Sequence, residues 1–385
     1  MCIRDRRVPE DYDKPQGRQV ELPFIIFKAE EHNENTIPLV VAGGGGPGGA
    51  LGISESDWYT FNSSAWMSWY NSTINAGRDL VLIDNRGVGS SVPSLDCDEV
   101  ENAAITSMDK LLDKNELKTL TKESYAACKQ RLLNQGIDIS QYHVINAAKD
   151  LEQLRTGLGV DQLNVYGVSY GTRVSLVYER LFPDSARTLI LDGIYPPSTR
   201  TYEDEPRHNA EAILRVIDKC KEDNQCYSRF GNDLDVRFSE YLEQLSTSPV
   251  TVSITNPVDY KPVEVLVTPQ VVFDSIFSAI YDETVIAHIP KYLHAIIEGN
   301  TDYLAELVRD YFITELTTHS LYEGAYASYA CFDEIPFVDF AAARDQLKAF
   351  PFQHYSNELL FDYIEVMCEI WDVPKAPADF KEPYK

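Results

Sequence analysis

The segment Val165-Tyr166-Gly167-Val168-Ser169-Tyr170-Gly171-Thr172 contains the pattern Gly-x-Ser-x-Gly. It follows a short apolar run at residues 162–166 and precedes a helical pattern at residues 172–182. This strand–turn–helix context is the one that a nucleophile elbow requires. The two small glycines permit a sharp, strained turn that lifts the serine hydroxyl clear of a sheet. The segment therefore predicts Ser169 as a catalytic nucleophile, and the alternative is a glycine-rich turn that only packs a helix on a strand.

A second glycine-rich segment, Ala42-Gly43-Gly44-Gly45-Gly46-Pro47-Gly48-Gly49, follows another apolar run at residues 37–42. A nucleophilic serine needs hydrogen-bond donors for the oxyanion of the tetrahedral intermediate. Glycines let backbone N–H groups approach a substrate oxygen, so we expect donors at Gly45 and Gly46, together with the N–H of Tyr170. A phosphate-binding loop is disfavoured, because no Gly-Lys-Ser/Thr follows and Pro47 has no N–H.

The first half of the chain alternates short β-rich runs with helical patterns. Most of these runs are apolar and bounded by Gly, Asp or Pro, as buried parallel strands are. Between two of them, residues 145–158 have the spacing of an amphipathic helix. This alternation predicts an α/β fold with a mostly parallel sheet and helices on both faces. The expected strands are residues 21–29, 37–42, 79–84, 162–166 and 188–191.

After Pro196-Pro197 the pattern becomes mainly helical, with one β-rich stretch at residues 250–268. We therefore expect a first core part at residues 1–197, a large helical cap at 198–372 and a return toward the core at 373–385. The helical periodicity covers residues 207–221, 233–246, 269–281, 284–297 and 301–315.

A third loop, Asp84-Asn85-Arg86-Gly87-Val88-Gly89-Ser90-Ser91, also follows an expected strand. Asp84 and Arg86 carry opposite charges and are expected to pair, which would brace this loop beside the glycine-rich segment. A direct contact of Arg86 with substrate is the alternative.

Composition excludes several function classes. The chain has 34 Lys and Arg against 60 Asp and Glu, a net charge of −26, so clustered basic patches for nucleic acid or anionic membranes are not expected. No apolar run is long enough to predict a membrane span, and residues 1–12 are too charged for a signal peptide. An acidic solvated surface is the simplest interpretation of the charge.

The order of these motifs, with Asp150-Leu151-Glu152-Gln153-Leu154-Arg155 and Leu191-Asp192-Gly193 in their places, resembles the α/β-hydrolase serine peptidases of the prolyl aminopeptidase and tripeptidyl aminopeptidase group. The resemblance implies an α/β-hydrolase core with a helical cap inserted after the sixth strand. It also implies removal of N-terminal residues or short peptides through an acyl-enzyme, with a peptide substrate that has a free N-terminus. An esterase or acyl hydrolase of the same fold and a catalytically inactive binding protein are the alternatives.

In this fold the acid and then the base follow the nucleophile along the chain. The histidines after Ser169 all lie in helical or cap-like contexts, and no apolar strand follows Trp371. We therefore expect the last core strands, the catalytic Asp and the catalytic His to lie beyond Lys385, in a chain that is a fragment with non-native residues 1–6. The alternative recruits Asp192 as the acid with His208 or His319 as the base.

Seven cysteines occur, and the odd one, Cys2, lies in the segment expected to be non-native. Without Cys-x-x-Cys pairs or a suitably placed histidine, neither a metal site nor a cofactor is expected. Free thiols are one possibility for the other six. Pairing by order is favoured among about 15 connectivities, and it would place the protein in an oxidising, extracellular or periplasmic compartment. The expected pairs are Cys97–Cys128, Cys220–Cys226 and Cys331–Cys368.

An exopeptidase needs an anion that meets the substrate ammonium group, because an unpaired buried charge is costly. The cap offers Glu203, Asp204 and Glu205 soon after its entry, and Asp333-Glu334 beside Cys331. We expect Glu334 in this role, since its setting Cys331-Phe332-Asp333-Glu334-Ile335-Pro336-Phe337 is apolar, with Glu203 as a second candidate. An aromatic cluster after the glycine-rich segment lines a pocket or packs in the core. It comprises Trp58, Tyr59, Phe61, Trp66, Trp69 and Tyr70.

Overall fold

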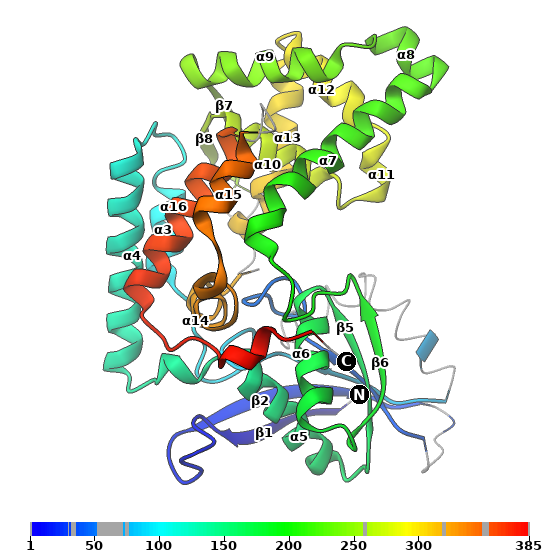
Figure 1. The fold of residues 1–385 in the computed structure, drawn as a ribbon, viewed down its shortest axis with the longest axis vertical. Coiled ribbons are helices and arrows are strands. Elements are labelled where there is room, and N and C mark those ends of the chain that lie inside the picture. Colours follow the sequence, from blue (N-terminus) through cyan, green and yellow to red (C-terminus); the bar gives the residue numbers. More distant parts are fainter. Residues whose placement is uncertain are drawn as a thin grey trace.

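The computed structural model describes residues 2–29, 31, 36–51, 72–73, 77–256, 260–317, 321–348 and 354–383 (Figure 1). The aromatic cluster at residues 58–70 and His319 lie outside the described residues.

The core is a six-stranded sheet with the order β1-β2-β4-β3-β5-β6. Neighbours among β4, β3, β5 and β6 are parallel, whereas β1 and β2 join the sheet in antiparallel pairings. This confirms the expected mostly parallel sheet and all five expected strands. The strands are β1 (Cys2–Pro9), β2 (Gln19–Phe27), β3 (Leu39–Ala42), β4 (Leu80–Ile83), β5 (Leu163–Val168) and β6 (Ala186–Asp192).

The register of the parallel strands brings the three sequence motifs to one edge of the sheet. Ala42 at the end of β3 pairs with Ile83 of β4 and with Gly167 of β5. Val168, the last residue of β5, pairs with Asp192 at the end of β6. The loops that leave these strands therefore start side by side, at the carboxyl edge where α/β sheets bind ligands.

Helices pack on the sheet and build a second region above it (Figure 1). Their ends follow local sequence rules: Asp113 forms a capping box with Glu116 at the start of α4, and Thr268-Pro269 opens α10. The helices of the first half are α3 (Asp98–Ile105), α4 (Lys114–Asn134), α5 (Val144–Leu158) and α6 (Tyr170–Leu181), with the 3-10 turn η1 (Ile139–Gln141).

The second half is mainly helical, as expected, with one antiparallel hairpin of β7 (Val250–Thr255) and β8 (Pro262–Val267). The earlier helices are α7 (Thr201–Glu222), α8 (Asn224–Phe230), α9 (Leu234–Thr247), α10 (Pro269–Ala279), α11 (Glu283–Ile286), α12 (Ile289–Ile297) and α13 (Thr301–Thr317). The later ones are α14 (Glu323–Asp333), α15 (Phe340–Leu347) and α16 (His354–Trp371), with η2 (Ile335–Phe337) and η3 (Ala378–Lys381).

Buried hydrophobic side chains form separate clusters. One cluster joins a face of the sheet to α4, α5, α6, α14, α15 and α16, and a smaller one covers the opposite face. A third lies within α7, α9, α10, α12, α13 and the hairpin. The helices α14 to α16 thus pack with the sheet although they follow the cap helices in the chain; the division at residues 197 and 372 stays a prediction.

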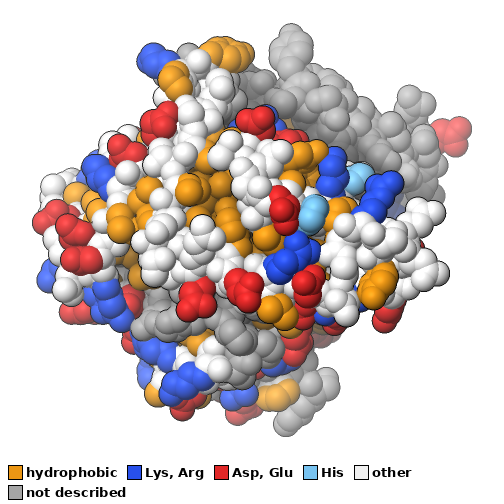
Figure 2. All heavy atoms as spheres, turned by 90° about the horizontal axis from the view of Figure 1, so that it is seen from above, with side chains coloured by type: hydrophobic (Ala, Val, Ile, Leu, Met, Phe, Trp, Pro, Cys, Tyr) orange, Lys and Arg blue, Asp and Glu red, His pale blue; other side chains and the backbone are white. Residues whose placement is uncertain are grey.

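The cap surface is mixed in character. Figure 2, which looks down on the molecule from above, shows hydrophobic side chains between charged side chains of both signs. The large exposed hydrophobic residues of the cap include Tyr227, Val236, Val250 and Tyr281. In the part of the chain that the structure describes, no helix combines the length and the apolar character that crossing a membrane requires.

Three disulfides confirm the pairing by order. Cys97 at the start of α3 is bonded to Cys128 in α4, and Cys220 in α7 to Cys226 in α8. Cys331 in α14 is bonded to Cys368 in α16. The bond across 31 positions between Cys97 and Cys128 stabilises the fold by about 3–4 kcal/mol in the chain-entropy description.

Candidate active site

Ser169 lies on a strained turn between β5 and α6. Its backbone has φ 51° and ψ −118°, its side chain is exposed, and its N–H donates a 2.9 Å hydrogen bond to the carbonyl of Asp192. A positive φ is rare for a residue with a β-carbon and persists only where its surroundings enforce it. A β-carbon at Gly167 would lie 2.7 Å from Ser175 Oγ, so only glycine fits this turn. The geometry is that of the expected elbow.

The glycine-rich loop after β3 lies beside this elbow. A β-carbon on Gly44 would stand 3.4 Å from the carbonyl oxygen of Val168, the residue before Ser169. Gly45 and Gly46 both have positive φ, 73° and 74°, which glycine adopts without strain. The loop thus turns sharply next to Ser169, as an oxyanion loop would.

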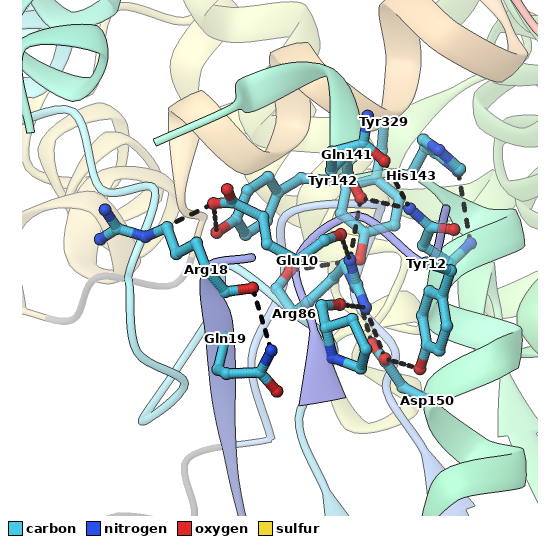
Figure 3. A network of polar contacts seen from close by, with 12 residues as sticks. Glu10, Tyr12, Arg18, Gln19, Arg86, Gln141, Tyr142, His143, Asp150 and Tyr329 are labelled. Carbon is cyan, nitrogen blue, oxygen red and sulfur yellow. Dashed lines mark hydrogen bonds and ion pairs between the residues drawn. The ribbon is translucent and has the colours of Figure 1, made fainter. Parts of the chain in front are cut away.

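Arg86 has a different partner from the one expected. It forms a bidentate ion pair with Asp150 of α5, with Nε–Oδ2 2.7 Å and Nη2–Oδ1 2.6 Å (Figure 3). The expected pair with Asp84 is therefore wrong; Asp84 instead accepts a 2.6 Å hydrogen bond from the N–H of Leu51. The Arg86 side chain is 0% exposed, which also excludes a direct substrate contact.

The Arg86–Asp150 pair fastens the N-terminal segment to the core. Arg86 donates to the carbonyls of Glu10, Pro9 and Gln141, and Tyr12 donates a 2.7 Å hydrogen bond to Asp150 (Figure 3). Buried charges are tolerated only when their hydrogen-bonding groups are satisfied in this way.

The described residues do not supply a base or an acid to Ser169. Within them, the Ser169 hydroxyl has no hydrogen-bond partner. Asp192 accepts a 2.8 Å hydrogen bond from Tyr166, and His208 contacts the neighbouring Arg207 at 2.7 Å. The alternative triad of Asp192 with His208 has no support in these contacts, and His319 lies outside the described residues.

Both carboxylates expected to bind the substrate ammonium group already hold cations. Glu334 is buried and forms an ion pair with Arg173, and Lys381 Nζ lies 3.6 Å from its second oxygen. Glu203 pairs with Arg200 at 3.1 Å and accepts a 2.8 Å hydrogen bond from the N–H of Asp339. The apolar setting indicated burial of Glu334 correctly but gave no sign of its partners.

Two adjoining cavities are lined by elements of the expected cap, and the larger one also by helices of the first half. The larger, about 470 Å³, is lined mainly by apolar residues of α3, α4, β8, α10 and α13, and by Leu321. Leu321 packs on Gly48, because a β-carbon there would be 3.0 Å from Leu321 Cδ1, so the cavity adjoins the glycine-rich loop. The smaller, about 250 Å³, is lined by Glu205 and shares Asp274 with the larger one. An apolar cavity of this size with a few polar groups is typical of a ligand site.

Glu205 lines the smaller cavity and has a raised pKa. Its pKa is raised to about 7, mainly by burial and to a smaller extent by the charges of Asp274 and Glu334, whereas a hydrogen bond with Asn209 acts in the opposite direction. A carboxylate poised near neutral pH in a cavity is a candidate for function. No pattern in the sequence separates Glu205 from its acidic neighbours.

Three carboxylates gather at the start of α3. Ligand atoms of Asp96, Asp98 and Glu101 lie within 4.8 Å of one another, and Asp96 and Glu101 also line the larger cavity. Acidic groups often gather in this way on a surface that binds no ion.

The sheet and elbow define an α/β hydrolase of the serine hydrolase class, and the α/β-hydrolase-fold family matches residues 38–224. The serine protease Hip1 of Mycobacterium tuberculosis (strain H37Rv) is 26% identical, over 95% of this chain and 70% of Hip1. The tripeptidyl aminopeptidase of Streptomyces coelicolor is 33% identical, over 50% of this chain and 34% of its own. A solved α/β-hydrolase-fold protein from Chitinophaga pinensis is 18% identical, over 55% of this chain and 51% of its own, with a TM-score of 0.29. These similarities support an α/β-hydrolase serine peptidase of the tripeptidyl aminopeptidase-like type.

Proposed function

We propose that this protein is a serine exopeptidase that releases N-terminal residues or short peptides through an acyl-enzyme on Ser169. One observation carries the proposal: the exposed hydroxyl of Ser169 stands on a strained elbow with a glycine-rich loop beside it. A turn that only packs a helix on a strand would not need a serine with φ 51° at its apex. The similarity to the serine protease Hip1 and to tripeptidyl aminopeptidase supports a peptidase.

In the proposed reaction, the Ser169 oxygen attacks the scissile carbonyl carbon and its proton passes to a base. The N–H groups of Tyr170 and of Gly45 or Gly46 stabilise the oxyanion, and the peptide amine leaves with a proton. Water then cleaves the acyl-enzyme, which returns the serine hydroxyl. The described residues leave the base and the acid unassigned.

For the substrate ammonium group we propose Glu205 with Asp274, since both line the smaller cavity. Glu334 contributes through its charge, which already acts on Glu205. The contacts of Glu203 do not favour it, and its role stays a prediction. The apolar cavity beyond would receive hydrophobic side chains of the peptide.

The three disulfides favour an extracellular or periplasmic location, because such bonds persist in oxidising compartments. Mass spectrometry of the unreduced native protein would show three bonds. Six free thiols would contradict this location.

The test of the function compares three substrate classes with the complete protein: tripeptidyl arylamides, the same peptides with an acetylated N-terminus, and acyl esters. An exopeptidase hydrolyses the peptides with a free N-terminus but not the acetylated ones. Ser169→Ala should abolish this turnover. Equal hydrolysis of free and acetylated peptides contradicts exopeptidase specificity. A preference for acyl esters would support an esterase, which the apolar lining of the larger cavity also allows.

A further inference from the structure

Helix α14 and its flanking residues contact both halves of the proposed oxyanion hole. Before the helix, the N–H of Tyr322 donates a 2.9 Å hydrogen bond to the carbonyl of Gly48, and Leu321 forms a β-bridge with Gly49. At its end, Asp333 accepts a 2.6 Å hydrogen bond from the hydroxyl of Tyr170. One helix thus touches the glycine-rich loop and the residue after Ser169.

The contact at the end of α14 is a buried polar cluster on the first turn of α6. Tyr170 is 1% exposed, and the side chains of Arg173 and Asp333 are 0% exposed. Arg173 Nη1 lies 3.5 Å from Asp333 Oδ1 and pairs with Glu334. Low polarity strengthens such interactions, and breaking one leaves a buried group unsatisfied.

Arg173 also fixes the chain that leaves β6. Its Nε and Nη2 donate to the carbonyls of Tyr195 and Pro196, at 3.4 and 3.3 Å, and the guanidinium lies 4.1 Å from the ring centre of Tyr195. The first turn of α6 is thus held from α14 on one side and from the segment after β6 on another.

We propose that Asp333 is a positioning residue, which fixes the backbone N–H of Tyr170 toward the oxyanion by holding the Tyr170 hydroxyl. The proposal rests on the proposed function, because it takes this N–H as an oxyanion donor. Such a donor must lie within about 2.7–3.1 Å of the oxyanion, so a shift of about 0.5 Å weakens it. The Tyr170 side chain is rigid between its ring and Cβ, and a tether at its hydroxyl therefore restrains the backbone from which it projects.

The chain contains a matched control for this arrangement. Tyr12, Asp150 and Arg86 repeat the chemistry of Tyr170, Asp333 and Arg173: a tyrosine hydroxyl donates to a buried carboxylate that a buried arginine holds. Tyr12 lies in the N-terminal segment and does not contact the elbow. Loss of its hydroxyl should therefore affect stability alone.

The experiment measures kcat, KM and the unfolding midpoint of the complete protein with Tyr170→Phe, Asp333→Asn, Asp333→Ala or Tyr12→Phe. It also measures inhibition by a peptide aldehyde, whose tetrahedral adduct places an oxyanion in the hole. We expect Tyr170→Phe and Asp333→Ala to lower kcat by about tenfold and to weaken the aldehyde similarly, with KM within about twofold. Asp333→Asn keeps a hydrogen-bond acceptor and should retain more activity than Asp333→Ala. Tyr12→Phe should leave kcat and aldehyde affinity unchanged.

A purely structural role gives a different pattern, in which the Tyr170 and Tyr12 variants lose stability alike and keep kcat and aldehyde affinity. That pattern, with turnover still abolished by Ser169→Ala, overturns the role of Asp333. Turnover that survives Ser169→Ala contradicts the proposed function instead. If Asp333→Ala fails to fold, the conservative pair Tyr170→Phe and Tyr12→Phe decides between the outcomes.

Discussion

The α-carbon of Gly171 lies against the carbonyl of Gly43, so closely that a β-carbon at position 171 would overlap that oxygen and crowd the carbonyl of Ala42. The helix that begins behind Ser169 therefore contacts the start of the glycine-rich loop directly. The elbow and the loop can pack this closely because residue 171 has no side chain.

Gly171→Ala should consequently destabilise the fold by about 3 kcal/mol, because α6 must move away from β3. Gly157→Ala is the control: it lies inside α5, and the nearest atoms to its new β-carbon would be those of the Arg6 side chain, at 3.4 Å or more. That variant should be as stable as the parent or more stable by about 0.5–1 kcal/mol. Urea unfolding measures both, and equal midpoints for the two variants would contradict the proposed packing.

Removal of the buried Arg86 charge is expected to be costly. Arg86→Met leaves Asp150 buried with only Tyr12 as a side-chain partner, and should destabilise by about 3–5 kcal/mol in denaturant unfolding. Lys348→Met removes an exposed pair with Asp345 and should have no measurable effect. A small effect of Arg86→Met would show that the network contributes little to stability.

His143 predicts an acid-dependent loss of stability. Its ring is buried and stacked on Phe332, with ring centres 4.0 Å apart, and burial together with the charges of Arg86 and Lys149 lowers its pKa to about 3. The folded protein keeps this ring neutral, while the unfolded chain takes up a proton below about pH 6.5. The contribution of neutral His143 to the free energy of unfolding is therefore fully present above pH 6.5. It is lost as the pH falls toward 3, by up to about 1.4 kcal/mol per pH unit.

His143→Asn should reduce that pH dependence. Asparagine does not titrate, and its side-chain oxygen can still cap α5 as His143 Nδ1 does for the N–H of Asn146. His208→Asn, at an exposed position, is the control and should leave the slope unchanged. Unfolding free energies between pH 4 and 7 measure the difference, and identical slopes for all three proteins would exclude His143 as the source.

If Glu205 receives the substrate ammonium group as a carboxylate, KM should rise as the pH falls below about 7, where its pKa lies. The rise approaches tenfold per pH unit, because the protonated acid offers no charge. Glu205→Gln should raise KM at neutral pH and abolish this dependence, whereas Asp204→Asn, outside the cavity lining, should keep the parent profile. A pH-independent KM in the parent enzyme would rule out Glu205.

Much of the core could be predicted because its signals are local. The runs that became β3, β4 and β5 are apolar on both faces, and the glycines around Ser169 mark the turn by themselves. β1 was missed because half of its eight residues are charged: within the described residues it pairs with β2 alone, and Arg7 reaches the exposed side, where it forms an ion pair with Glu21. The non-native origin expected for residues 1–6 stays a prediction.

Ion-pair partners far apart in the chain could not be predicted. Arg86 had an acidic residue two positions away, yet pairs with Asp150 because α5 brings that carboxylate under the loop. Glu334 was expected to meet a substrate cation, but α6 supplies Arg173 instead. A sequence pattern indicates that a charge is buried and does not indicate which element will meet it.

Helix α14 has a consequence for the order of events during synthesis. A chain leaves the ribosome from its N-terminus, and strands β1 to β6 with Ser169 are synthesised long before residues 322–334 have been made. The nascent elbow carries its serine but has neither the contact to Gly48 nor the one to Tyr170. In the proposed role of Asp333, the N–H of Tyr170 is therefore fixed as an oxyanion donor only after the later segment has folded back onto the earlier one.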